Sequence, residues 1–202
     1  MLFDSGFFKL GRKDVSAVGD KRKRPVTGQS IDLGNAVTLR GLVPSRASEE
    51  SNLFSGGDEN LKTIVLLLKY KRFVLYLGGD ANDKIESFLG RLVGDLDDYI
   101  AGHHGSETSS TEYFLREIKP EISIISVDDR NIYGHPSSDT VSRLKSFSSK
   151  VFQTEKGSLS SIANSNEIAI GTIIIMTDGF SYEISGSDLR SFTKQTDRRE
   201  EN

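Results

Sequence analysis

Hydrophobic residues in the middle of the chain recur with the periods typical of strands and helices. Two apolar runs, at 63–70 (TIVLLLKY) and 72–78 (RFVLYLG), are separated by Lys71 and predict a buried β-hairpin. The spacing then changes at 82–93 (NDKIESFLGRLV), where apolar residues recur at every third or fourth position and predict one face of a helix. The apolar positions on that face are Ile85, Phe88, Leu89 and Leu92.

The same alternation continues beyond this helix. Short apolar segments predict three further strands, at 97–101, 121–127 and 150–154. Amphipathic segments between them predict helices at 109–119 and 137–147. Strands and helices that alternate in this way indicate an α/β fold in which helices cover a sheet.

Local signals refine the ends of these elements. Ser109 and Glu112 have the spacing of a capping box and predict the start of the second helix. Near the C-terminus, apolar segments at 167–177 and 180–185 predict a closing hairpin around Asp178–Gly179. Upstream, residues 35–44 (NAVTLRGLVP) predict a strand that ends at Pro44.

The chain divides into three expected segments. Residues 1–45 form an irregular N-terminal segment with a strand pair, residues 46–190 form the α/β domain, and residues 191–202 form a charged, disordered tail. The domain begins with a polar loop at 45–60.

Composition excludes several classes of protein. A formal net charge of −3 provides no general attraction to nucleic acid, and the absence of cysteine excludes disulfides and thiolate metal sites. The basic run at 21–24 (KRKR) is read as a solvated loop, with phosphate contact as the alternative. The apolar runs are far shorter than the roughly 20 residues that span a bilayer, and the N-terminus does not resemble a signal peptide. We therefore expect no membrane span and a cytoplasmic protein.

All three histidines of the chain follow predicted strands, as does one notable aspartate. Asp80 follows the second strand of the hairpin, His103 and His104 follow the strand at 97–101, and His135 follows the strand at 121–127. Loops after parallel strands meet at one edge of a sheet, so Asp80, His103 and His135 should lie within about 10 Å of each other. Aspartate and histidine suit zinc or manganese, so this edge is a candidate metal site.

Each of these residues also has a purely structural explanation. Asp80 precedes a helix and suits a capping position, and the histidine pair lies in a glycine- and serine-rich loop that suits an ordinary surface. His135 precedes Pro136, which suits a turn. The coincidence of all three at one edge favours a shared site.

Several motifs together resemble a known family. They are GD at 79–80, AGHHGS at 101–106 and NIYGHP at 131–136, set among strands and helices in a matching order over residues 58–160. In this respect the chain resembles the metallo-β-lactamase-fold domain at the C-terminus of ComEC-type DNA-uptake proteins. The resemblance implies an αββα sandwich and a metal-dependent hydrolase related to phosphodiesters or nucleic acid.

The resemblance also implies roles for individual residues. Asp80 corresponds to an aspartate that bridges two metal ions, and His103 corresponds to a later metal histidine, with His104 as the alternative. Asn131 and His135 correspond to positions near the leaving group and are the candidate catalytic residues. Ser106 and Tyr133 lie in the same motifs and are candidate substrate-binding residues.

The sequence departs from this family in one major respect. The His-x-His-x-Asp-His metal motif of the family is absent, and no histidine precedes His103. The sandwich is therefore expected to lack its N-terminal metal-motif half, to bind its divalent metal weakly or not at all alone, and to be inactive in isolation.

Three interpretations remain open. The chain is a truncated or split hydrolase whose other half comes from a second polypeptide, a catalytically inactive binding or interaction protein with this fold, or an unrelated α/β binding module. In the first case one sheet is built from 63–78, 97–101, 121–127 and 151–154, while 31–43 and 170–184 are pieces of the other. The face of the first sheet would then lack a cover and would require a partner.

Overall fold

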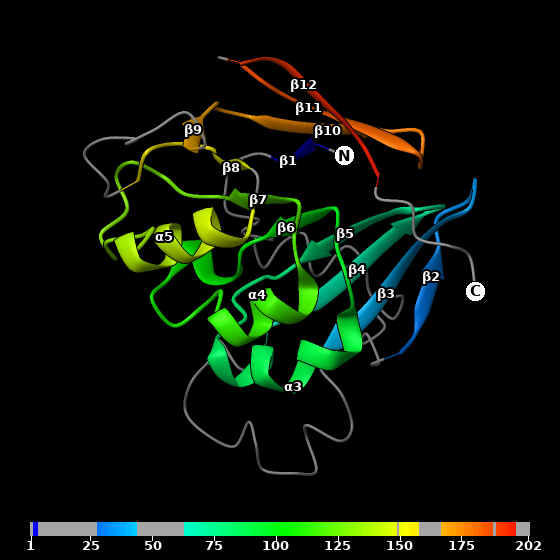
Figure 1. The fold of residues 1–202 in the computed structure, drawn as a ribbon, viewed down its shortest axis with the longest axis horizontal. Coiled ribbons are helices and arrows are strands. Elements are labelled where there is room, and N and C mark those ends of the chain that lie inside the picture. Colours follow the sequence, from blue (N-terminus) through cyan, green and yellow to red (C-terminus); the bar gives the residue numbers. More distant parts are fainter. Residues whose placement is uncertain are drawn as a thin grey trace, which may run out of the picture.

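A computed structural model describes residues 2–3, 28–43, 63–148, 150–157, 167–187 and 189–196. These residues form a large β-sheet, a smaller sheet on one of its faces, and helices on the other face (Figure 1). The described part of the chain is thus a mixed α/β fold with a layer of helices and two layers of strands, as the alternation of predicted elements indicated.

The large sheet has eight strands, which are antiparallel in one half and parallel in the other. Across the sheet they are β2 (Ser30–Asp32), β3 (Val37–Val43), β4 (Val65–Tyr70), β5 (Phe73–Leu77), β6 (Asp98–Ile100), β7 (Ile122–Ile125), β8 (Lys150–Gln153) and β9 (Glu167–Ala169). Neighbours from β2 to β5 are antiparallel, which confirms the hairpin predicted around Lys71. Neighbours from β5 to β9 are parallel, so the loops after these strands leave from one edge.

Three helices connect the parallel strands: α3 (Asp83–Val93), α4 (Glu112–Ile118) and α5 (Ser138–Phe147). Their N-caps are Asn82, Thr111 and Ser137, whose side chains each accept a backbone hydrogen bond from the first turn. The predicted helices are confirmed, but the predicted capping box at Ser109 is wrong because Thr111 caps α4. Leu92 is also 63% exposed, so it does not belong to the buried face expected for α3.

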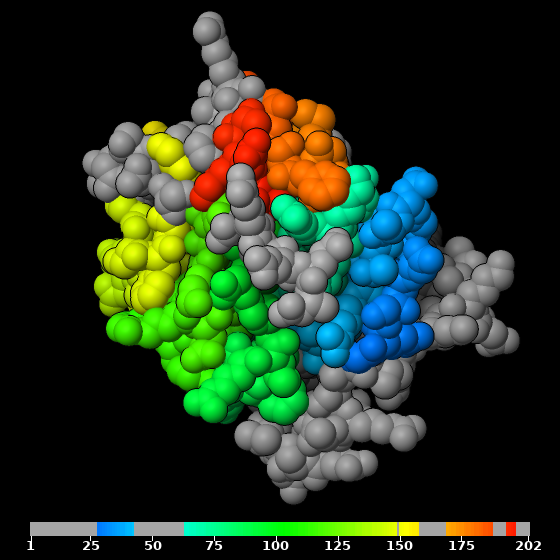
Figure 2. All heavy atoms as spheres, turned by 45° about the vertical axis from the view of Figure 1, so that its right-hand side comes forward, coloured from blue at the N-terminus to red at the C-terminus, as the bar shows by residue number. Residues whose placement is uncertain are grey.

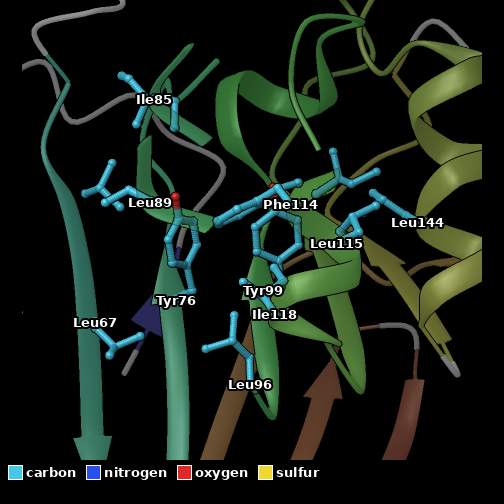
Figure 3. Close-up of a cluster of buried hydrophobic side chains, with 14 of the residues drawn as sticks. Leu67, Tyr76, Ile85, Leu89, Leu96, Tyr99, Phe114, Leu115, Ile118 and Leu144 are labelled. Carbon is cyan, nitrogen blue, oxygen red and sulfur yellow. The ribbon is translucent and has the colours of Figure 1, made fainter. Parts of the chain in front are cut away.

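The helices pack on the large sheet around three aromatic rings. Tyr76, Tyr99 and Phe114 lie with ring centroids 5.4 to 6.0 Å apart, and all three are fully buried. Figure 3 shows aliphatic side chains from α3, α4 and α5 around these rings. Tilted aromatic pairs of this kind add about 0.5–1.5 kcal/mol each beyond their buried area, so this layer fixes the helices firmly on the sheet.

The smaller sheet is formed by both ends of the described chain. In order, it consists of β1 (Leu2–Phe3), β10 (Ile173–Thr177), β11 (Ser181–Gly186) and β12 (Leu189–Gln195), all antiparallel. The hairpin predicted around Asp178–Gly179 is confirmed. The tail expected to be disordered from residue 191 contains strand residues as far as Gln195, because β12 pairs with β11.

A second hydrophobic core lies between the two sheets. Leu68, Phe73 and Ile124 of the large sheet pack with Ile175, Tyr182 and Ile184 of the smaller one. In Figure 2 the orange β10–β11 segment lies against the cyan β4–β5 segment, where Lys71 Nζ donates to Asp178 O at 2.8 Å. The sheet face that we expected to lack a cover is therefore covered by the C-terminal strands.

We had expected residues 31–43 to belong to the smaller sheet. They belong to the large sheet instead, because β3 pairs with β4. Between β9 and β10 the chain crosses from one sheet to the other over three residues, 170–172, and Gly171 adopts a φ of 71° there.

Three carboxyl groups lie at the amino ends of β6 and β7, and two of them, those of Asp97 and Asp98, are buried. This acid edge consists of Asp97, Asp98 and Glu121. Glu121 Oε2 accepts a hydrogen bond from Tyr182 Oη at 3.1 Å and pairs with Lys194 Nζ at 3.0 Å. Asp98 is fully buried, and its carboxyl oxygens have no hydrogen-bond partner among the described residues. Burial, followed by the charges of Asp97 and Glu121, raises the pKa of Asp98 well above its ordinary value.

Two expectations fall outside this description. The basic run at 21–24 and the polar loop at 45–60 lie outside the described residues. Within the described ranges, no helix combines the length and the apolar character needed to cross a membrane.

Candidate functional site

The parallel strands bring the predicted site residues to one edge of the large sheet. Asp80 follows β5, His103 and His104 follow β6, and His135 follows β7. His104 Nε2 lies 3.8 Å from Asp80 Oδ1, and the rings of His103 and His135 lie 5.4 Å apart. The expectation that these residues share an edge is confirmed, and we call this group the His edge.

Backbone contacts tie the first two loops of the His edge together. His103 N donates to Gly79 O at 2.8 Å, and Asp80 N donates to Thr63 Oγ1 at 2.8 Å. Gly79 has a φ of 53°, and a Cβ atom at this position would collide with Thr63 Oγ1. Glycine is therefore required here by both conformation and space, and it sets the position of Asp80.

Both adjacent histidines adopt a left-handed backbone conformation. They lie in the short turn η3 (Gly102–Gly105), with φ and ψ of 49° and 43° for His103 and 55° and 28° for His104. Left-handed geometry costs an L-residue about 1–2 kcal/mol, and such strain concentrates at functional sites. The turn therefore holds two consecutive residues in a backbone conformation that is unfavourable for L-residues.

Hydrogen bonding orients the His104 imidazole. Its Nδ1 lies 2.8 Å from Ser126 O, and because a carbonyl only accepts, Nδ1 carries the proton of this bond. The other nitrogen, Nε2, faces the Asp80 carboxylate at 3.8 Å, too far for a hydrogen bond. A histidine whose Nδ1 donates to a carbonyl while Nε2 points into a polar site has the usual orientation of a metal ligand.

The other two histidines are packed against each other. His103 Nδ1 is buried and has no hydrogen-bond partner among the described residues. Burial, followed by the proximity of His103 and His104, lowers the pKa of His135 from its ordinary value. The surroundings of His135 therefore favour its neutral form.

The Asn131 side chain shapes the loop that carries His135. Its Nδ2 donates to Asp128 O at 2.7 Å and to His135 O at 2.8 Å, while its Oδ1 accepts from His135 N at 2.9 Å. Both polar atoms of the amide are thus engaged with backbone groups. The catalytic role predicted for Asn131 stays a prediction, and the contacts observed here position His135.

The two predicted substrate-binding residues differ in accessibility. Ser106 is 7% exposed, and its hydroxyl lies 3.3 Å from Thr108 Oγ1 within a tight turn. Tyr133 is 71% exposed, and its ring is stacked on His135 with centroids 6.0 Å apart. Only Tyr133 is in a position to meet a substrate without rearrangement.

Two charged residues that the sequence analysis did not single out hold the loop after the histidines. Glu86 of α3 accepts hydrogen bonds from Ser110 N at 2.5 Å and Thr111 N at 2.7 Å. Arg143 of α5 donates to three carbonyls of the same loop, those of Glu107, Ser109 and Ser110. The only signal for them in the sequence is a charged residue within a helical pattern, which normally indicates a solvated face.

The described residues do not make a complete metal site. Asp80 and His104 present two donors to a common point, and no group of three or more His, Cys, Asp or Glu side chains in the described ranges could hold an ion. Zinc sites use three or four protein ligands, so Asp80 and His104 correspond to part of such a set.

The comparisons identify the relatives of this chain. No protein-family model matches it. It is 35% identical over 103 residues to Recombination protein 2 of Haemophilus influenzae, covering 51% of this chain and 13% of that protein. It is 34% identical over 113 residues to Competence protein ComA of Neisseria gonorrhoeae, a match that covers 54% of this chain and 16% of ComA. It is 25% identical over 146 residues to ComE operon protein 3 of Bacillus subtilis, a match that covers 71% of this chain and 19% of that protein.

These matches show what the chain is similar to. The chain is a relative of ComEC-type competence proteins, and it spans less than a fifth of their length. Among solved structures, a protein of the metallo-β-lactamase superfamily from Thermotoga maritima matches with a TM-score of 0.35 and 13% identity, over 60% of this chain and 57% of that one. A TM-score this low is not sufficient to identify the fold.

Proposed function

We propose that the His edge is part of a divalent-metal site in a hydrolase that acts on phosphodiester bonds of nucleic acid. Asp80 and His104 are the metal ligands contributed by this chain, and the ions that suit this pair are zinc and manganese. His135 and Tyr133 lie beside them, where a substrate would be held.

The orientation of His104 supports this proposal most strongly. Ser126 O accepts a hydrogen bond from His104 Nδ1, so the other ring nitrogen, Nε2, is directed toward the Asp80 carboxylate at 3.8 Å. Imidazole nitrogen and carboxylate oxygen are both ligands of zinc and manganese, so a divalent ion suits the space between these two groups. The left-handed backbone at His104 is consistent with this proposal, because such conformations cluster at ligand sites.

The relatives support the substrate class. The proteins that this chain resembles carry names that refer to recombination and competence, both of which concern DNA. Nucleic acid is therefore the substrate we propose for this site.

The second candidate is a binding or interaction protein without catalytic activity. The observation in its favour is the small number of ligands, since the whole sequence contains three histidines and no cysteine. In the hydrolase proposal, a second polypeptide or another segment supplies the missing ligands.

Metal titration tests the proposed half-site. We expect the chain to bind one Mn²⁺ or Zn²⁺ ion, with affinity reduced at least about tenfold in Asp80→Asn and in His104→Gln. Calorimetric titration measures the affinity, and Asp83→Asn is the matched control because Asp83 is an exposed aspartate on α3. Equal affinity in all four proteins would show that Asp80 and His104 do not bind metal.

Turnover separates the two candidate functions. We expect the chain alone, supplied with Mn²⁺ or Zn²⁺, not to hydrolyse a chromogenic phosphodiester, because the described residues provide two ligands. Hydrolysis that is lost in Asp80→Ala would show that the residues of this chain suffice for catalysis. Metal binding without turnover, even when a candidate partner polypeptide is added, would favour the binding protein.

A further inference from the structure

We propose that Tyr133 is a stacking platform for an unpaired nucleobase, so that the His edge receives single-stranded rather than double-stranded nucleic acid. This inference rests on the proposed function for the substrate class. It adds the state of the strand and the residue that recognises it.

The loop after β7 exposes two neighbouring apolar side chains beside the His edge. Ile132 is 89% exposed and Tyr133 is 71% exposed. A single exposed apolar residue is ordinary, but two in succession at the rim of a polar site leave considerable apolar surface in water. Such a surface next to reactive groups is typical of a place where a ligand is bound.

One face of the Tyr133 ring packs on a neighbouring ring, and the other face is exposed. It is stacked on the His135 ring with centroids 6.0 Å apart and an interplanar angle of 19°. Because one face of Tyr133 packs on His135, its exposed surface belongs to the opposite face and the ring edge. A nucleobase fits such a surface because every base presents a flat π-face, whichever base it is.

The loop is also fixed in place by hydrogen bonds to its neighbours. Asp129 Oδ1 accepts from Gly157 N at 2.7 Å, and Asp129 N donates to Glu155 Oε2 at 2.9 Å. The Asn131 amide closes the other end of the loop through His135. A platform that is ordered before binding loses little conformational entropy when a ring settles on it.

Charge around the platform favours contact with a base over contact with phosphate. Asp128, Asp129 and Glu155 surround the loop, and Arg130 is the exposed cation beside Tyr133, with 93% of its side chain in solvent. The chain as a whole carries a net charge of −3. Binding through phosphate would depend steeply on salt, whereas binding through a stacked ring depends on it weakly.

The platform is continuous with the His edge. The His135 ring lies 6.0 Å from Tyr133 on one side and 5.4 Å from His103 on the other. The open face of Tyr133 is the one turned away from His135, so a base stacked there lies beside the His edge, with the Tyr133 ring between the base and the histidines. A base in an intact duplex is stacked on its neighbours and has no free face to offer.

Fluorescence anisotropy with a labelled oligothymidylate, in the presence of EDTA, tests the platform independently of metal and of hydrolysis. We expect Tyr133→Ala to weaken binding roughly tenfold or more, and Tyr133→Phe to leave it nearly unchanged, because the flat ring is retained. The matched control is Phe180→Ala, which removes an exposed aromatic ring from the hairpin between β10 and β11. Duplex DNA and an abasic oligonucleotide are expected to bind weakly to every variant.

Several results would overturn the platform. One is the absence of measurable single-strand binding, and another is an equal loss for intact and abasic strands in Tyr133→Ala. A steep salt dependence that Tyr133→Ala does not alter would also overturn it. If the metal titration fails but Tyr133→Ala still weakens single-strand binding, the half-site is rejected and the platform is kept. If metal binds as expected but Tyr133→Ala has no effect on single-strand binding, the platform alone is rejected.

Discussion

The two edges of the large sheet hold polar side chains under opposite conditions. The His edge lies at the carboxyl ends of the parallel strands, where Asp80 and His104 are each nearly half exposed and the backbone is strained. The acid edge lies at the amino ends of β6 and β7, where Asp98 is fully buried between two sheets. At the acid edge a lysine and a tyrosine from the smaller sheet contact Glu121, whereas at the His edge a carboxylate and an imidazole nitrogen face each other without a hydrogen bond.

The difference separates polar groups that stabilise the fold from polar groups that are available to a ligand. Contacts across the acid edge join the two sheets, so changes there should alter the free energy of unfolding. Side chains of the His edge are more exposed, with Asp80 and His104 nearly half in solvent, so changes there should alter ligand binding more than stability.

The largest expected effect is the loss of Lys194. Lys194→Met removes the positive charge that offsets the acid edge and should lower the free energy of unfolding by about 1–3 kcal/mol, less than for a fully buried pair because Lys194 is 32% exposed. Urea denaturation measures the change. Lys119→Met is the control, since Lys119 pairs with Asp95 at the surface and its loss should cost less than about 0.5 kcal/mol. Equal losses in the two variants would contradict the role assigned to the acid edge.

A smaller effect concerns the dependence of stability on pH. The folded state raises the pKa of Asp98 above its unfolded value, so the folded protein binds this proton more tightly than the unfolded chain does. Stability should therefore be lost as pH rises from about 4 through the folded pKa, with a slope of up to about 1.4 kcal/mol per pH unit for one proton.

Asp98→Asn should remove this slope. Asp97, Glu121, Lys194 and Tyr182 also face the group and remain in the variant. Thermal melts at several pH values measure the slope for both proteins. An unchanged slope in Asp98→Asn would show that another group binds the proton.

The smallest effect concerns the strained turn. His104→Gly and His104→Ala both remove the imidazole, but the Gly variant should be more stable by about 0.5–1 kcal/mol because glycine adopts a φ of 55° without strain. Chemical denaturation compares the pair. At Glu107, which is exposed and does not have a positive φ, the Ala variant should be at least as stable as the Gly variant. If the Gly and Ala variants rank in the same order of stability at both positions, the turn stores no strain.

Much of the fold was predictable because its signals are local. Apolar spacing predicted α3, α4, α5 and the strands between them, and the order of strands and helices placed Asp80 and the histidines at one edge. The start of α4 was not predictable in detail, because Ser109 and Thr111 are both suitable caps. Glu86, which is distant in sequence, binds the Ser110 and Thr111 amides and contributes to the choice.

Features that depend on long-range pairing were missed. The face of the large sheet was expected to lack a cover, but β10, β11 and β12 provide one, and their pairing with each other does not show where they dock. The acid edge was missed because Asp97 and Asp98 look like the polar start of a strand. Both aspartates are buried in the folded chain, which only the long-range packing of the C-terminal strands on the large sheet reveals.

The crossing at Gly171 has a consequence for how the molecule can be divided. Ile170 N donates to Gln153 O at 3.0 Å and Gly171 N to Thr154 O at 2.9 Å, and two residues later the chain enters the smaller sheet. No linker separates the two sheets at this point, so they cannot be excised as independent modules. Local opening of β10 should also expose the amides of Ile170 and Gly171, which donate to carbonyls at the end of β8, so these amides should exchange hydrogen together with those of β10.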